Sequence, residues 1–144
     1  EGGRDGNYFP GSTIEYIAGY TEKILHTNHQ VLQVVDAILA NSATPPVIVL
    51  QADHGPGAWL QWDSVEKTCL WERTAIFNAY YLPDAGAEIL YPDITPVNTF
   101  RVIFNTYFGT DLPLLEDRIY FSSWNRLYDF IDVTDRVAYP CDVQ

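Results

Sequence analysis

The sequence predicts an α/β domain, with helices flanking a mixed, mostly parallel sheet. Three features indicate this fold: a long amphipathic segment over residues 12–42, a continuous apolar run over residues 47–51, and further strand-like and helix-like segments behind them. The chain has 144 residues, of which 47% are hydrophobic, enough for one domain with its own core. We therefore expect a single domain over residues 1–144.

The first expected element is a long helix. Apolar residues recur at three- and four-residue spacings over residues 14–39. Ser12 followed by Glu15 is the pattern of a capping box at a helix start, and Pro45 and Pro46 end the segment. The pattern therefore predicts one helix that ends close to residue 42.

Four residues inside this helix need an interpretation of their own. Gly19 leaves open a break near the first turns. Asn28 falls within the apolar stripe, so we expect it to be buried, hydrogen-bonded and involved in orienting a loop near the strand end. His26 and His29 share a face of the helix, and we interpret them as solvated side chains and not as ligands.

The next expected element is a strand over residues 47–51. This run is rich in β-branched residues and is bounded by prolines and by Gly55, which is typical of a strand buried on both faces in a parallel sheet. A long connection without a clean period follows over residues 55–73. Residues 74–83 then indicate a second strand.

The last third of the chain predicts one helix and two short strands. Thr95 has the character of an N-cap, Pro96 suits the first helical position, and Gly109 suits the end of the helix. Residues 117–123 and 127–134 are the two strand candidates. The resulting order of elements favours a layered α/β domain, although it contains few strands for a complete enzyme.

Composition excludes several classes of partner. The formal net charge is −11 with only 8 lysines and arginines, which argues against nucleic acid or an anionic membrane surface. No apolar run approaches the length of a membrane span, and the polar, glycine-rich start from Glu1 is not a secretory signal. Such a start indicates a piece of something longer. The two cysteines, Cys69 and Cys141, are too few for a disulfide scaffold, and their pairing is left open.

The strongest candidate for chemistry is the pair Asp53 and His54, just beyond the carboxyl end of the 47–51 strand. A carboxylate and an imidazole are good ligands for zinc or a similar divalent ion, and Gly55 and Gly57 permit a turn that brings them together. The plainer alternative is that Asp53 caps the loop and His54 is a satisfied polar residue. Two residues alone cannot complete a zinc site.

Two long stretches resemble a known family. The helix end "VLQVVDAILANS" followed by "PPVIVLQADHGPG" resembles the C-terminal part of sulfatase-like hydrolases of the alkaline phosphatase superfamily. The later stretch "ILYPDITPVNTFRVIFNTYFGTDLPLLEDRIYFSSW" is similar to the segment that follows Asp-His-Gly in membrane-anchored sulfatase-like proteins. The resemblance spans roughly residues 14–134.

The resemblance implies a metal-dependent phosphate- or sulfate-ester hydrolase or phospho-group transferase. In that family one or two divalent metals assist attack by a Ser, Thr or modified Cys. Carried over, Asp53 and His54 are metal ligands for zinc, manganese or calcium, and the segment contains no catalytic nucleophile. It would therefore be an inactive C-terminal fragment of a larger catalytic domain that binds metal weakly or not at all by itself. The implied location is an extracytoplasmic, soluble part of a membrane-anchored protein.

Two sequence features depart from the family pattern. No histidine follows His54, so a downstream ligand or substrate contact is absent or replaced. The stretch from Cys69 to Arg73 superficially resembles the Cys-x-Pro-x-Arg motif of sulfatases, but Trp71 replaces the proline and the order in the chain is wrong. We interpret this second match as a coincidence.

Two other hypotheses remain open at this point. A degenerate, non-catalytic binding or scaffold module is suggested by Trp59 and Trp62, which would stack on a sugar or a partner protein; ordinary packing of these rings is the alternative. A self-contained α/β domain without a site is the third hypothesis. The fragment hypothesis, in contrast, predicts an exposed apolar surface for the missing N-terminal half, or a homodimer through that surface.

Overall fold

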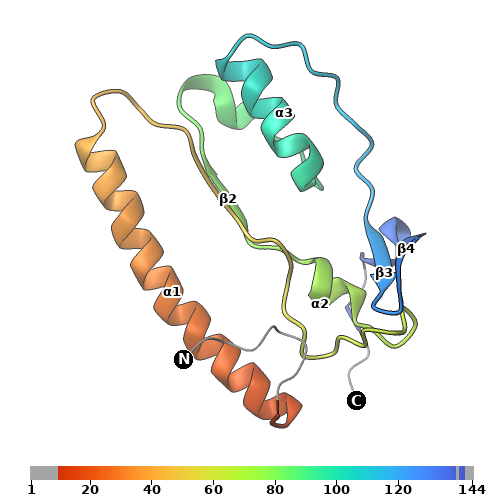
Figure 1. Cartoon of the computed structure of the whole chain (residues 1–144). Helices are drawn as coiled ribbons and strands as arrows, with labels where there is room; N and C mark the ends of the chain where they lie inside the picture. The colour runs from red at the N-terminus through yellow and green to blue at the C-terminus, as the bar shows by residue number, and fades with distance from the viewer. Residues whose placement is uncertain (1–9, 139, 142–144) are drawn as a thin grey trace.

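The computed structural model describes residues 10–138, 140 and 141 of the chain, which combine helices with small antiparallel sheets. The elements, in chain order, are α1 (Thr13–Asn41), β1 (Ile48–Gln51), α2 (Leu70–Thr74), β2 (Asn78–Tyr81), η1 (Asp84–Ile89), α3 (Pro96–Tyr107), β3 (Tyr120–Ser123), β4 (Arg126–Asp132) and η2 (Thr134–Arg136). In the view of Figure 1 the β1–β2 ladder lies between α1 and α3, and the β3–β4 hairpin lies at the end of a long extended segment.

Helix α1 begins and ends where the sequence predicts. The Ser12 hydroxyl accepts from the Glu15 N–H at 3.3 Å, and the Glu15 carboxylate accepts from the Ser12 N–H at 2.7 Å, which completes the capping box. The helix continues without interruption through Gly19. At the other end, the side chains of Asn41 and Ser42 donate to carbonyl groups of the last turn.

The apolar stripe of α1 is mostly uncovered within the described chain. No residue of this helix is buried, and Ile14, Leu25 and Leu32 are 80%, 66% and 61% exposed. Asn28 is exposed as well, so the prediction that it is buried is wrong for this chain. The physical reason is that nothing in residues 10–138 packs over this side of α1.

The first sheet contains two antiparallel strands and not the predicted, mostly parallel arrangement. β1 pairs with β2 in a register that places Ile48 opposite Tyr81 and Gln51 opposite Asn78. The residues of β1 are half-buried, since β2 is its one partner strand in the described chain. β2 is also shorter than the predicted 74–83 strand. The Gln51 side chain links this sheet to α3 by donating to the Thr99 hydroxyl at 3.2 Å.

Helix α3 confirms the predicted boundaries. Thr95 is its N-cap, Pro96 is its first residue, and Gly109 follows the last turn with a φ of +65°. The N-cap residue is held in place by a distant side chain, because the Asp117 carboxylate accepts from the Thr95 N–H at 2.8 Å and from the Thr95 hydroxyl at 2.6 Å. Burial opposes the charge of Asp117, but hydrogen bonds from Thr95 and Tyr91 hold its pKa below the usual range.

Three side chains of α3, which we call the clamp, hold the main chain of the extended segment 110–119. Two asparagines each donate to the carbonyl and accept from the N–H of one residue, and an arginine donates to a carbonyl. The pairs are Asn98 with Leu115 (2.8 and 2.9 Å), Arg101 with Pro113 (2.9 Å) and Asn105 with Leu112 (2.8 and 2.7 Å). The clamp supplies hydrogen-bond partners to a segment that belongs to no sheet.

A small apolar core lies beneath the β3–β4 hairpin. It is formed by the buried residues Val65, Leu70 and Val133, against which Ile119 and Phe121 pack. The disulfide between Cys69 and Cys141 joins the start of α2 to the C-terminal end of the described chain. In the ranges that the structure describes, no helix combines the length and the apolar composition needed to cross a bilayer.

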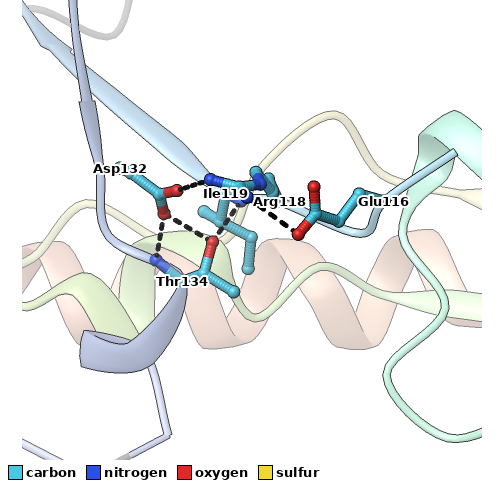
Figure 2. A network of polar contacts seen from close by, with 5 residues as sticks. All are labelled: Glu116, Arg118, Ile119, Asp132 and Thr134. Atoms are coloured by element: carbon cyan, nitrogen blue, oxygen red, sulfur yellow. Dashed lines mark hydrogen bonds and ion pairs between the residues drawn. The ribbon is translucent and has the colours of Figure 1, made fainter.

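A polar network fixes the base of the hairpin (Figure 2). Arg118 donates to Asp132 and to Glu116, both at 2.8 Å, and Asp132 accepts from the hydroxyl and the N–H of Thr134 at 2.7 and 3.0 Å. The Thr134 hydroxyl in turn accepts from the Ile119 N–H at 2.9 Å. The Glu116 and Asp132 hydrogen bonds raise the pKa of Arg118 above its usual value. The network therefore keeps the two strands in register where the extended segment enters the sheet.

Candidate functional site

Asp53 and His54 lie directly after the end of β1, as the sequence predicts. The last ladder bond runs from the Ala52 N–H to the Phe77 carbonyl at 2.9 Å, and the chain turns immediately beyond it. Asp53 closes this turn by accepting from the His54 N–H at 3.0 Å. The turn places both side chains together, with Asp53 Oδ2 at 3.5 Å from His54 Nε2.

Gly55 permits a close approach between this turn and α2. Its N–H donates to the Arg73 carbonyl at 2.8 Å. A Cβ at position 55 would overlap the Glu72 carbonyl oxygen and would lie 3.0 Å from the Ala75 carbonyl oxygen. The φ of Gly55 is not positive, so packing and not backbone conformation requires glycine here.

Glu72, on the first turns of α2, orders the loop that follows the pair. This carboxylate is only 8% exposed, and it accepts from the N–H groups of Ala58 and Trp59, both at 3.1 Å. Buried carboxylates of this kind are stabilised by charge-assisted hydrogen bonds. Glu72 therefore holds the "GPGAW" loop against α2.

Arg73 reaches the candidate pair from the same helix. Its Nη1 lies 2.7 Å from His54 Nδ1 and 3.0 Å from the Gly55 carbonyl oxygen, and its guanidinium lies 5.8 Å from the ring centre of Trp62. Burial lowers the pKa of Arg73, and neighbouring carboxylates, among them Asp53, act in the opposite direction. Sequence reasoning missed Arg73, because it set the stretch 69–73 aside. The scarcity of basic residues was the one signal that could have drawn attention to it.

His54 Nδ1 has two neighbours of opposite character. Arg73 Nη1, which can only donate, lies 2.7 Å away, and the Gly55 carbonyl oxygen, which can only accept, lies 2.9 Å away. Arg73 Nη1 also donates to that carbonyl oxygen at 3.0 Å. The other ring nitrogen, Nε2, faces the Asp53 carboxylate, with Oδ2 at 3.5 Å.

The pair has the spacing of two ligands of one tetrahedral ion. Zinc–nitrogen and zinc–oxygen bonds of about 2.0–2.2 Å at a tetrahedral angle separate two ligand atoms by about 3.3–3.6 Å. The distance between Asp53 Oδ2 and His54 Nε2 is 3.5 Å, and the side chains are 87% and 50% exposed to solvent. Residues 10–138 contain no cluster of three or more His, Cys, Asp or Glu side chains suited to a metal. The described chain thus offers two positions of a coordination sphere.

The pair opens into a cleft of about 1300 Å³. Its lining residues come from two parts of the sequence, with His54, Trp62 and Arg73 from the first and Arg118, Tyr120 and Thr134 from the second. Trp62 packs edge-on against Trp124 of the hairpin turn at a ring distance of 5.8 Å. Trp59 and Trp62 are both half-buried, so part of each ring is used in packing.

The remaining candidates stay apart from the pair. His26 and His29 are exposed on α1, as predicted, and His29 Nε2 lies 3.2 Å from Gln33 Nε2. Cys69 is bonded to Cys141, so it cannot act as a nucleophile in this state, in line with the interpretation of the 69–73 stretch as a coincidence.

Comparison of the chain with protein-family models, with curated protein sequences and with solved structures gives no match. The functional interpretation therefore depends on the geometry of the site and on the sequence resemblance described above.

Proposed function

We propose that this chain is the C-terminal part of a metal-dependent phosphate- or sulfate-ester hydrolase or phospho-group transferase. In this proposal Asp53 and His54 are two of its metal ligands. The observation that carries the proposal is the 3.5 Å separation of Asp53 Oδ2 and His54 Nε2 at the end of β1, in an open cleft. An imidazole ligand favours zinc or manganese over calcium, which prefers oxygen ligands.

The chemistry divides between this chain and the rest of the proposed domain. A bound divalent ion would supply Lewis-acid stabilisation of charge on the ester oxygens. In this chain, Asp53 and His54 would hold the ion, while Gly55 and Glu72 fix the turn and the loop that carry them. The nucleophile and the other ligands would come from upstream sequence, so the segment alone is inactive.

Three observations support a larger, extracytoplasmic domain of the alkaline-phosphatase layered type. The apolar stripe of α1 is uncovered, and β1 has an edge without a partner strand in the described chain. The Cys69–Cys141 disulfide favours an oxidising compartment. The missing N-terminal half of the domain is the partner that we propose for the uncovered surface, with a homodimer as the alternative.

The test uses the full-length protein with its upstream region. Phosphodiester and sulfate-ester hydrolysis is measured with Zn²⁺, Mn²⁺ and Ca²⁺, together with the bound metal content. The double variant Asp53→Ala/His54→Ala should lose both activity and metal. The matched control, His26→Ala/Asp129→Ala, removes an exposed histidine and an exposed aspartate away from the pair and should keep both. Activity and metal content that survive in the Asp53/His54 variant would show that the site assignment is wrong.

A non-catalytic binding module is the second candidate. It is favoured by the exposed aromatic residues of the hairpin, where Trp124 is 56% and Tyr128 90% exposed. The same assay separates the two proposals. A full-length protein that hydrolyses neither ester with any of the three metals supports the binding module.

A further inference from the structure

We propose that the free edge of β1, the side that faces away from β2, pairs with a strand from sequence upstream of residue 1. This upstream strand would run parallel to β1 and would be covered by the apolar stripe of α1. The inference rests on one part of the proposed function, the larger domain, and it requires no metal ion.

The hydrogen-bond pattern of the β1–β2 ladder identifies the backbone groups at this edge. The Ala52 N–H donates to the Phe77 carbonyl at 2.9 Å, and in an antiparallel ladder such bonded pairs alternate with unbonded pairs. The N–H and C=O of Leu50 therefore point towards β2, whereas those of Val49 and Gln51 point to the free edge. Both residues are half-buried, so their backbone groups need hydrogen-bond partners.

The composition of β1 suits an interior strand. Its sequence, IVLQ, contains neither charged residues nor proline, which commonly protect a free edge from pairing. β4, by contrast, is exposed along its whole length and carries Arg126, Asp129 and Asp132, so it has the character of a true edge strand. β2 is less apolar than β1, since it combines Asn78 with two tyrosines, which suits an outer position beside β1.

Helix α1 gives the direction of the upstream strand. The Tyr16 hydroxyl, near the start of α1, accepts from the N–H of Gly57, beyond the end of β1, at 3.1 Å. Residues 42–47 link the other end of α1 to the start of β1, so the two elements run antiparallel, as the colours in Figure 1 show. A helix of this kind joins parallel strands in a right-handed crossover. A strand that leads into α1 would therefore run parallel to β1.

The uncovered part of the α1 stripe offers the apolar cover that the upstream strand needs. Val31 and Val35 are half-buried, whereas Leu25 and Leu32 are 66% and 61% exposed. Strands of a parallel sheet are apolar on both faces, because helices cover both sides. One added element would thus satisfy both the free edge of β1 and the exposed leucines of α1.

A second copy of the chain is the other possible occupant of this edge. A twofold axis would pair β1 with its own copy in antiparallel direction, and α1 would then not serve as a crossover. Such a dimer would also bring together two chains that each carry a net charge of −11. Charge and chain direction therefore favour the upstream strand.

Parallel pairing also has a consequence for the candidate site. The carboxyl ends of parallel strands meet at the same edge of a sheet, so the residues that follow the upstream strand would lie beside Asp53 and His54. Trp62 and Arg73 line the cleft next to this pair within the described chain. The upstream strand is therefore the segment whose end would complete the site.

Amide hydrogen exchange of the full-length protein, resolved to single residues, tests the pairing. The protection factors of Val49 and Gln51 should lie within about tenfold of that of Leu50, whose N–H points to β2. Protection factors of Val49 and Gln51 that are lower by more than this would show a free edge and overturn the proposal. Protection that disappears as a dimer dissociates on dilution would assign the edge to a second copy, and would overturn it as well.

Proline at position 49 removes the N–H that the upstream strand would accept. Val49→Pro should lower the protection factor of Leu50 at least about tenfold below that in Val49→Ala, because a buried carbonyl loses its donor. Phe130 in β4 is the matched control: the Val133 N–H donates to the Ile119 carbonyl, so the alternation points the Phe130 N–H outward. Phe130→Pro should change the protection of the hairpin less than about threefold relative to Phe130→Ala.

Equal effects of proline at the two positions would overturn the pairing at β1. If Val49→Pro does not fold, the exchange of the wild type decides. The outcome is independent of the proposed metal ligands, because Val49 and Gln51 can be protected in a protein whose activity and metal content survive Asp53→Ala/His54→Ala.

Photo-crosslinking identifies the occupant. p-Benzoylphenylalanine in place of Leu25, in the exposed stripe, should crosslink to a peptide upstream of residue 1 in the full-length protein. The same residue in place of Lys23, an exposed position on the other side of α1, should not. Crosslinks from position 25 that stay within residues 1–144, or that join two copies of the protein, would overturn the proposal.

Discussion

Asn98 is the residue of the clamp whose loss should be most costly. Its side chain is 0% exposed. Its Nδ2 donates to the Tyr91 hydroxyl, the Leu115 carbonyl and the Asp117 carboxylate at 2.9, 2.8 and 3.0 Å, and its Oδ1 accepts from the Leu115 N–H at 2.9 Å. Asn98→Ala removes all of these contacts at once and adds no new partner.

The magnitude follows from the number of hydrogen bonds that the buried Asn98 side chain makes. The variant loses four of them, and each contributes about 0.5–1.5 kcal/mol, with more for the one to the charged Asp117. We therefore expect Asn98→Ala to lower the free energy of unfolding by about 3–5 kcal/mol. Asn105 offers a matched control, because it makes the same pair of contacts with Leu112, but its side chain is only half-buried and these hydrogen bonds are exposed to solvent. Water replaces these lost partners, so Asn105→Ala should cost only about 1 kcal/mol.

Urea unfolding of the wild type and the two variants measures the difference, and amide hydrogen exchange shows where it arises. The Leu115 amide should lose its protection in Asn98→Ala, and the Leu112 amide in Asn105→Ala. Equal destabilisation by both variants, or unchanged exchange at Leu115, would refute the argument that burial sets the cost of this contact.

Three further predictions concern the turn, the disulfide and the hairpin. Gly55→Ala should lower the free energy of unfolding by about 2–3 kcal/mol in a denaturant titration, because the new Cβ overlaps the backbone of α2. The control Gly19→Ala places its Cβ near no other atom and should raise the free energy of unfolding by up to about 1 kcal/mol. An unchanged stability of Gly55→Ala would contradict the close packing at this position. The Cys69→Ser/Cys141→Ser variant opens a loop with a sequence separation of 72, and its free energy of unfolding should be about 4 kcal/mol lower than that of the disulfide-bonded wild type. A difference below about 1 kcal/mol would show that this loop does not constrain the unfolded chain. Hydrogen bonds from a neighbouring threonine and the ion pair in Figure 2 hold the pKa of Asp132 below its usual value, so its stabilisation is present above about pH 4 and is lost as the pH falls through the lowered pKa. The protection factors of the hairpin amides, which compare the measured exchange rate with the intrinsic rate at the same pH, should accordingly fall in acid. Asp132→Asn should remove that dependence, and an equal acid dependence in the variant would assign it to another group.

Local signals explain which elements the sequence could predict. The capping box at Ser12 and the Thr95-Pro96 start of α3 act within one helical turn, and both are confirmed. Distant partners decide the rest. The apolar run of β1 suits any buried strand, so its pattern does not reveal an antiparallel partner, and the burial of Asn28 depends on what covers α1.

The candidate site shows the same division. The adjacency of Asp53 and His54 at a strand end is visible in the sequence, and the structure brings the two side chains together. Arg73 is separated from His54 by the loop that Glu72 orders, so no local spacing relates them. Only the folded backbone, with Gly55 docked on α2, places the guanidinium against the imidazole.

The close approach at Gly55 has a consequence for how such sites diverge during evolution. Position 55 has no room for a side chain, whereas a Cβ at Gly57 would make only ordinary contacts of 3.6 Å with Leu60. A descendant that lost Asp53 and His54, and with them the proposed metal site, would still need this glycine to keep its turn against α2. Conservation of the third residue of Asp-His-Gly would therefore report an intact fold, whereas conservation of the first two residues would bear on the proposed metal site.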